Sequence, residues 1–427
     1  MNPDARRVQR TFLALTLGTT LSASLVWGIN TLFLLDAGLS NAQAFAANAF
    51  FTAGMVLFEI PTGVVADSRG RRLSYVLGAV VLALTTLGYV GLWWTGAPFW
   101  AWALVSVGIG LGYTFFSGAL EAWLVDALRA TGAPDELERV FSRAQVASGS
   151  AMLVGSVAGG VIAQFSSLGV PFVVRAVLLL VTGAIAAVWM KDLGFAPDRS
   201  AGVRRAVVDL TRASVRSGLG NPPVRWLMVS GFFLSGVGFY AFYALQPFLL
   251  ELYGRRDAYG IAGLAAAAFA GSQILGGLVG PRIRRRVSRR TSLLIAGAGL
   301  GAALLAALGA NRHFGTAVVL LVTWGLVSAA VAPVRQTYLH DLVPSGQRAT
   351  VLSFDSLISN AGGVALQPAL GRVADLGGYG TSLLVGAGIQ LLALPFLALS
   401  RRSGGTADRR RTPRTQLPTP PGPATLS

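Results

Sequence analysis

Long apolar stretches separated by short polar links fill the chain from residue 11 to residue 400. A helix of about 20 apolar residues is long enough to cross the hydrocarbon core of a bilayer. Runs of this length predict an all-α integral membrane protein with twelve transmembrane helices. The predicted spans are 11–34, 44–66, 73–94, 99–128, 140–165, 171–190, 223–250, 259–280, 291–310, 314–340, 349–375 and 381–400.

The predicted spans form two sets of six. A polar segment, 191–222, separates a first bundle in 1–190 from a second bundle in 223–400. The helical period of this segment favours a helix on the cytoplasmic membrane surface over the alternative, a solvated linker. Its apolar face would carry Val203, Val207 and Leu210, and its charged face Arg205, Asp209, Arg212 and Arg216. The tail, 401–427, lacks an apolar period, and we expect it to be disordered.

Composition agrees with a membrane location. Hydrophobic residues make up 53% of the chain and charged residues only 12%, against about 25% charged in a typical soluble domain. The net charge of +17 follows from topology, because all but five of the 35 basic residues fall on one side of the predicted membrane. Basic residues resist translocation, so we expect a multi-pass inner-membrane protein with both termini cytoplasmic, in contact with lipid and not with nucleic acid. The five exceptions are Arg175, Arg255, Arg256, Arg312 and Arg372.

Metal and thiol chemistry find little support in the sequence. The chain has no cysteine and only two histidines, His313 and His340. Disulfides and thiol catalysis are therefore excluded, and we expect neither a metal site nor a cofactor. The links between spans contain no paired nucleophile and base, so we do not expect an enzyme.

The first polar link with a recognisable pattern is GVVADSRGRR, between the second and third spans. Its functional candidates are Gly63, Asp67, Gly70, Arg71 and Arg72. Glycines permit a sharp turn and the arginines favour the cytoplasmic side. The pattern GxxxDxxGRR resembles the signature of the major facilitator superfamily of secondary transporters at this link.

One position departs from that signature, since Ser68 stands where the family usually has a basic residue. The resemblance also implies a charge cluster in which Asp126, from the end of the fourth span, joins Asp67 and Arg71 and holds the inner side closed.

Internal repetition favours two related halves. A shift of 214 residues places Gly63, Arg71 and Arg72 on Gly277, Arg285 and Arg286, although Asp67 falls on Pro281. A shift of 212 residues places Gly155, Ser156, Gly159 and Gly160 on Gln367, Pro368, Gly371 and Arg372. The resemblance implies the major facilitator fold, two pseudo-symmetric six-helix bundles around a site near the membrane midplane.

The fifth span resembles the antiporter signature GxxxGPxxGG of the drug:proton antiporter branch through Gly155, Gly159 and Gly160, with Ser156 in place of proline. The alternative is ordinary close packing of small residues. The fourth span lacks the arginine that many of these antiporters carry in its outer half.

Three acidic residues lie inside apolar spans and are candidates for proton coupling: Glu121, Glu59 and Asp355. An ionised carboxylate at such a depth needs a proton, a partner or a water path. In the alternative interpretation, Glu59, two residues before Pro61, is a structural partner of an arginine or of a freed backbone amide. Asp355 would instead form a gate salt bridge with an arginine of similar depth. Glu121 is our main coupling candidate.

The family architecture implies that the first, fourth, seventh and tenth spans line the substrate cavity. The candidates on them are Trp27, Asn30, Tyr113, Phe116, Tyr240, Tyr243, Gln246 and Trp324. Aromatic walls with a few amides and one carboxylate suit a bulky amphipathic or cationic compound. The alternative is that these aromatics pack against lipid.

These observations predict a monomeric, proton-coupled exporter of a small molecule that resembles the drug efflux branch. Three alternatives stay open: an importer or symporter of a metabolite with the same fold, a membrane-embedded enzyme, and a receptor or scaffold.

Overall fold

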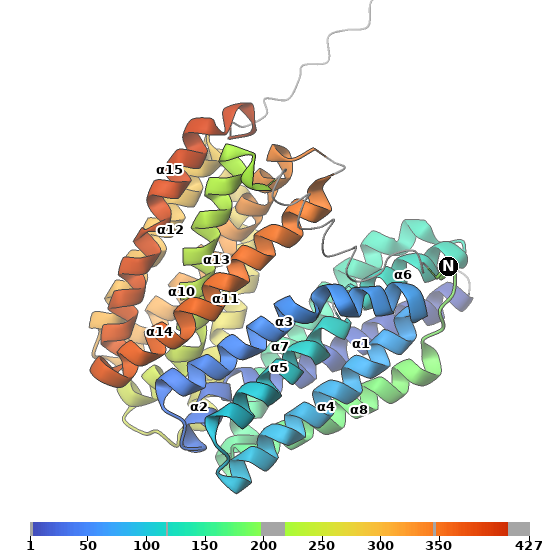
Figure 1. Ribbon diagram of the computed structural model, residues 1–427, viewed down its shortest axis with the longest axis horizontal. Helices are drawn as coiled ribbons and strands as arrows, with labels where there is room; N and C mark the ends of the chain where they lie inside the picture. Colours follow the sequence, from blue (N-terminus) through green and yellow to red (C-terminus); the bar gives the residue numbers. More distant parts are fainter. Residues whose placement is uncertain (1–2, 117, 198–217, 345–346, 409–427) are drawn as a thin grey trace, which may run out of the picture.

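The computed structural model describes residues 3–116, 118–197, 218–344 and 347–408, which are almost entirely helical (Figure 1). The first bundle contains α1 (Pro3–Trp27), α2 (Asn30–Asp36), α3 (Asn41–Arg69), α4 (Arg71–Thr95), α5 (Phe99–Phe116), α6 (Ala119–Ala130), the 3-10 turn η1 (Pro134–Glu136), α7 (Leu137–Phe165) and α8 (Gly169–Trp189). The second bundle contains α10 (Pro222–Tyr253), α11 (Tyr259–Arg286), α12 (Arg290–Ala310), α13 (Phe314–Leu342), α14 (Arg348–Leu391), α15 (Ala393–Ser403) and the 3-10 turn η4 (Gly405–Asp408).

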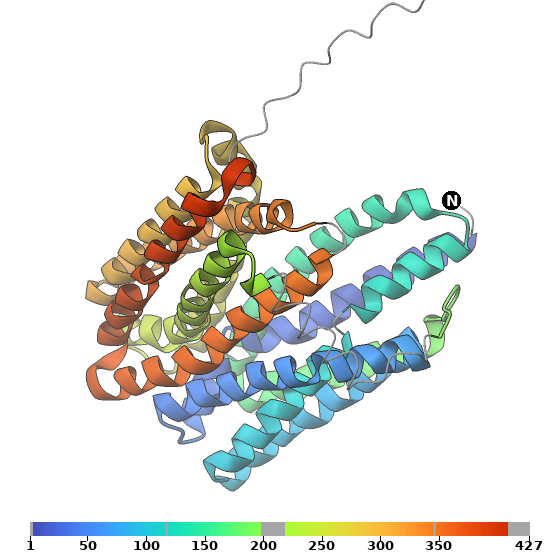
Figure 2. The same cartoon turned by 45° about the horizontal axis from the view of Figure 1, so that its top comes forward.

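These helices account for the predicted spans. In the described part of the chain, ten helices are long and apolar enough to cross a membrane, and the bent pair α1–α2 makes an eleventh span. The segment Thr350–Ser403 is 54 residues long, about 80 Å of helix, which is far more than a bilayer requires. Gly378, at φ 77° and ψ 170°, breaks it inside α14. The orange segment reverses there and returns as the red one (Figure 2), so it crosses twice and completes the twelve.

Two pairs of helices make most of the contact between the bundles, α3 with α14 and α7 with α11. They are the second and fifth helices of each half. At both contacts a glycine lets two helices approach: Gly160 of α7 lies on Gly263 of α11, and Gly371 of α14 lies on the first residues of α3. Gly160 and Gly371 lie on the fifth spans of the two halves. They are 211 residues apart (371 − 160), one fewer than the predicted shift of 212 residues. The fifth spans of both halves therefore lie at the interface between the bundles.

The bundles meet at the end that carries the α2–α3 and α10–α11 links, and they diverge toward the other end (Figures 1 and 2). We call the end where the bundles meet the closed end. It is the end that the arginine distribution predicts to face outward.

The structure describes the start of the C-terminal tail and the ends of the segment between the bundles. The start of the predicted disordered tail is ordered: α15 runs to Ser403, and the buried Asp408 accepts hydrogen bonds from the backbone N and Oγ1 of Thr291 at 2.8 and 2.9 Å. The expectation of disorder was therefore wrong for 401–408, because Asp408 satisfies the first turn of α12. The remainder of the tail, 409–427, lies outside the described residues. So does the part of the segment 191–222 that carries the predicted surface helix, 198–217.

Candidate functional site

A cavity of about 640 Å³ lies between the two bundles, within the usual range for small-molecule sites. Its walls come from α1, α2, α3, α4, α5, α7 and α8 of the first bundle and from α10, α11 and α14 of the second. Most lining side chains are aromatic or aliphatic. Such a space can hold a bulky molecule with both bundles in contact with it.

The break between α1 and α2 shapes one side of the cavity. The two helices meet at an angle of 47°, with Trp27 at the end of one and Asn30 at the start of the other. Gly28, within the break, packs closely against Gly263 and Ala266 of the second bundle, where a Cβ would lie only 3.0 Å from the Gly263 Cα. The indole and the amide on the two sides of this break both line the cavity.

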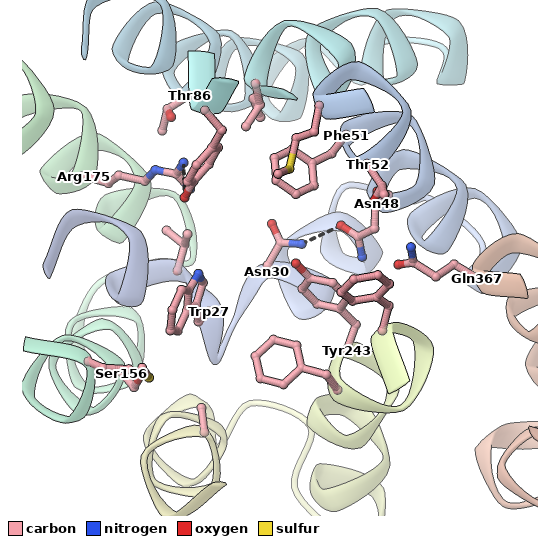
Figure 3. Close-up of a pocket in the computed structure, with 18 of the residues that line it drawn as sticks. Trp27, Asn30, Asn48, Phe51, Thr52, Thr86, Ser156, Arg175, Tyr243 and Gln367 are labelled. Carbon is pink, nitrogen blue, oxygen red and sulfur yellow. Dashed lines mark hydrogen bonds between the residues drawn. The ribbon is translucent and has the colours of Figure 1, made fainter. Parts of the chain in front are cut away.

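Polar groups on the cavity walls are few and specific (Figure 3). Asn30 Nδ2 donates to Asn48 Oδ1 at 3.0 Å. Arg175 Nη2 donates to the Tyr113 hydroxyl at 3.4 Å, and its guanidinium lies 5.8 Å from the centroid of that ring. Several further polar atoms are buried without a hydrogen-bond partner in the described structure: Asn48 Nδ2, Arg175 Nε, Thr86 Oγ1, Ser156 Oγ and Gln367 Oε1.

The structure divides the eight cavity candidates predicted from sequence. Trp27, Asn30, Tyr113 and Tyr243 line the cavity. The other four are placed elsewhere: Phe116 packs on Tyr75, Tyr240 bonds to Ser382 and packs on Phe45, Gln246 bonds to the α1–α2 break, and Trp324 stacks on Phe269. Among the described residues, α13 contributes no lining side chain, although the resemblance implied that the tenth span would.

The largest difference from expectation concerns charge. We expected a carboxylate in the cavity, but the described lining residues include no acid, and Arg175 brings a positive charge instead. Sequence reasoning had counted Arg175 with the outer-side arginines. It also missed Asn48, Gln273, Asn360 and Gln367. The signal for Arg175 was present, because an arginine five residues into an apolar span is costly unless it faces the bundle interior.

The three coupling candidates lie apart from the cavity. Glu121 is exposed in the first turn of α6, which begins after Gly118 at φ 68°. The expected burial of Glu121 inside one continuous helix was wrong, because α5 ends at Phe116. Glu59 is exposed on α3, one turn before Thr62, whose hydroxyl donates to the carbonyls of Phe58 and Glu59 near Pro61.

Asp355 is buried and paired. Its two oxygens accept from Arg335 at 2.6 and 2.7 Å, and the same guanidinium donates to the Leu227 carbonyl at 3.3 Å. This group links α14, α13 and α10 within the second bundle. A gate between bundles, the expected role, would need a partner on the first bundle.

The link around Gly70 forms a charge cluster with a different membership from the one expected. Asp67 pairs with Arg71 at 2.5 Å, but Asp126 forms no ion pair with either residue in the described structure. Asp192, just after α8, takes its place and accepts from the backbone N of Arg72 at 3.0 Å. Gly70 has φ 109°, and a Cβ on it would strike the Asp192 carboxylate, so two constraints favour glycine there. Gly63, by contrast, has open space around it.

The glycines of the antiporter-like helix α7 serve as contacts. Gly155 packs on Ser24 and Gly159 on the Leu25 carbonyl, both of α1, so closely that neither position has room for a Cβ. Gly160 faces α11 across the bundle interface, while Ser156 lines the cavity. One helix thus carries close packing within its bundle, contact with the other bundle and a cavity wall.

Six hydrogen bonds between described residues join the bundles at the closed end. Asp375 of α14 accepts from the backbone N of Asn41 and of Ala42 at 2.8 and 3.0 Å, and Tyr379 bonds to the Asn41 side chain. Gln246 of α10 donates to the Trp27 carbonyl at 2.5 Å and accepts from the Thr31 backbone at 3.3 Å. Gln164 of α7 accepts from the backbone N of Gly260 at 3.3 Å. We call this set the closed-end contacts.

Metal binding finds no support in the part of the chain that the structure describes. It contains no group of three or more histidine or acidic side chains arranged to hold an ion.

The sequence matches a known family of membrane transporters. The family model of the Major Facilitator Superfamily matches residues 12–285 and, in a second match, 257–426. The chain therefore belongs to the Major Facilitator Superfamily, and it is a multi-pass membrane protein with the fold of a transporter. No curated protein sequence matches it.

Three solved structures share the fold. One is a bacterial homologue of the human lysosomal transporter Spinster, described as inward-facing and unoccupied, with 16% identity, a TM-score of 0.73, and 96% of this chain and 100% of that chain covered. The nucleoside transporter NupG matches with 13% identity and a TM-score of 0.76, covering 93% of this chain and 99% of its own. The POT-family transporter PepTSo matches with 12% identity and a TM-score of 0.72, covering 93% and 98%.

Proposed function

We propose that this protein is a secondary active transporter that exports a bulky amphipathic small molecule in exchange for protons, by alternating access. The observation that carries the proposal is the cavity between two pseudo-symmetric bundles, which are held together at one end by the closed-end contacts. Rocking of the bundles around such a cavity would open it to each side in turn.

The arrangement supports an inward-facing state. The bundles diverge toward the end that the arginine distribution places in the cytoplasm (Figure 1). The opposite state would separate Asp375 from α3 and bring the ends around Gly63 and Arg71 together. The open space at Gly63 leaves room for that approach.

Export, rather than import, is favoured by the glycines of α7, whose spacing resembles that of the antiporter branch. Their close contacts with α1 and α11 place this helix where a bundle movement would be transmitted to the cavity. An importer with the same fold is the second candidate, and direction of transport separates the two.

The test is transport by purified protein in sealed vesicles, with and without an imposed proton gradient. Three dansyl compounds share one apolar body: dansylglycine is an anion, dansylglycinamide is neutral and dansylethylenediamine is a cation. In inside-out vesicles with an acidic interior, we expect gradient-dependent accumulation of at least one of them. Accumulation only when the gradient is reversed would favour the importer. Absence of movement with every compound and either gradient would count against the proposed transport.

A further inference from the structure

We infer that the cavity binds an organic anion, with Arg175 as the residue that receives its acidic group and the aromatic wall of the second bundle as the surface that receives its apolar body. This inference rests on the proposed transport function and assigns the charge class of its substrate.

Arg175 is a buried and charged side chain. Only 6% of its surface is exposed, and a guanidinium stays charged at any ordinary pH. Its contacts are the Tyr113 hydroxyl at 3.4 Å and the Tyr113 ring, while Nε has no hydrogen-bond partner in the described structure. A phenol cannot neutralise a full charge.

Arg175 has no counter-ion among the described residues. No carboxylate occurs among the described residues that line the cavity, and none forms an ion pair with Arg175 in that part of the chain. An unpaired buried charge is expensive, and ionisable residues inside a membrane usually face a substrate or ion path. An anionic ligand would supply both the missing charge and an acceptor for Nε.

The third step is the distribution of groups around Arg175. Figure 3 shows Thr86 beside it at the same wall, while Tyr243 lies across the cavity. The Thr86 hydroxyl is buried without a partner in the described structure and can donate to a second oxygen of the same acid group. The head of the ligand would thus be held by α4, α5 and α8 of the first bundle.

The fourth step is the opposite wall. Phe239 and Phe242 of α10 and Phe269 of α11 line the cavity there, and Phe242 and Phe269 pack with ring centroids 5.5 Å apart. This wall carries no charge in the described structure. It suits an apolar body of one or two rings. A ligand held in this way touches both bundles, so its binding can be linked to their relative movement.

The test is equilibrium binding of the same three dansyl compounds to the protein in nanodiscs, followed by dansyl fluorescence with empty nanodiscs subtracted. We expect dansylglycine to bind at least about tenfold more tightly than dansylglycinamide, as a charge-assisted hydrogen bond provides. In Arg175→Met this preference should vanish, and in Arg175→Lys most of it should remain. Phe269→Ala should weaken the anion and the neutral compound by the same factor.

One control variant separates the charge of Arg175 from the hydroxyl that it contacts. Tyr113→Phe removes the hydroxyl and retains the charge, so it should keep the anion preference even if Arg175→Met is poorly folded. Equal binding of anion and neutral compound by the parent, tighter binding of the cation, or an anion preference that survives in folded Arg175→Met would overturn the inference.

Failure of the inference differs from failure of the proposed function. A neutral or cationic compound that binds at least as tightly as dansylglycine and is transported would overturn only the charge assignment. If dansylglycine binds through Arg175 but none of the three compounds crosses the membrane under either gradient, the anion site stands and the proposed transport is overturned.

Discussion

The carboxylate of Asp375 accepts a hydrogen bond from the backbone N of Asn41 at 2.8 Å, so a side chain of the second bundle completes the first turn of α3 in the first. The next N–H, of Ala42, goes to the same carboxylate, and Ser40 caps the third. The positive end of the helix dipole also favours a carboxylate there. Because these bonds must break when the closed end opens, Asp375 stabilises the state described here.

Asp375→Asn should therefore favour opening of the closed end. Loss of the charge-assisted bonds, worth about 1.5 kcal/mol, would raise the open population about tenfold. The chain has no cysteine, so Ser156→Cys gives a single reporter in the cavity. We expect a membrane-impermeant maleimide to label it from the outer side about tenfold faster in Asp375→Asn.

The matched control is Asp257→Asn, in the exposed α10–α11 link at the same end. Hydrogen bonds from Arg255 hold the pKa of Asp257 below its usual value, so this change also removes a negative charge at neutral pH. Equal labelling rates in the two variants would show that the Asp375 contact does not hold the end closed.

The link around Gly70 should show a loss of function without loss of fold. Asp67 is half exposed, with 53% of its side chain accessible, and such a pair contributes only about 0–1 kcal/mol. Asp67→Asn and Arg71→Ala should reach the membrane in parental amounts and transport much more slowly. Gly70→Ala, at a positive φ and against Asp192, should instead lower the thermal midpoint. Parental transport by both charge variants would make the cluster purely structural.

Gly63→Leu should affect the state with a closed inner end and spare the inward-facing state. The site is open in this structure, so the thermal midpoint of the inward-facing protein should stay near that of the parent. Closure of the inner end needs that space, so transport should be abolished. Gly159→Leu is the contrast, because it meets the Leu25 carbonyl and should reduce folded protein. A fully active Gly63→Leu would mean that the inner ends never approach at this point.

Proton coupling can be assigned with two substitutions. If Glu121 carries the proton, Glu121→Gln should abolish gradient-driven accumulation while downhill exchange continues, with no loss of stability because the residue is exposed. Asp355→Asn leaves the partly buried Arg335, with 19% of its side chain exposed, without its carboxylate partner, which should lower the thermal midpoint. A Glu121→Gln variant that still pumps against a gradient would move the coupling role to Glu59 or Asp355.

The tail should be dispensable only beyond Asp408. Truncation after Asp408 should leave transport and stability unchanged, because the bonds to Thr291 remain. Truncation after Arg402 removes them and should lower the thermal midpoint by several degrees. Asp408→Asn gives a matched substitution with an intermediate effect. Equal stability of the two truncations would contradict the role assigned to Asp408.

The spans and the bundle division were predictable because apolar runs of membrane length leave few alternatives. The glycines of the fifth span likewise indicated close helix contacts, because glycine permits two backbones to approach. The closed-end contacts were not predictable. Asp375 acts on backbone groups of Asn41 and Ala42, and no side-chain pattern in the sequence reports such a bond.

The cavity was only partly predictable for a similar reason. Helices line it along one face, and the sequence does not fix the rotation of each helix within the bundle. Tyr240 and Tyr243 lie on the same span, yet only Tyr243 reaches the cavity. Glu121 was taken for a buried residue because the break at Gly118 has no signal beyond one glycine.

Two distances across the bundle interface test alternating access most directly. Spin labels on Trp100→Cys and Leu376→Cys report the closed end, and labels on Arg129→Cys and Arg348→Cys report the other, all at exposed positions. Pulsed electron–electron double resonance in nanodiscs should show that Asp375→Asn lengthens the distance at the closed end. It should shorten the distance at the other end in the same fraction of molecules. Unchanged distances at both ends, or lengthening at both ends together, would contradict a two-bundle rocking transporter.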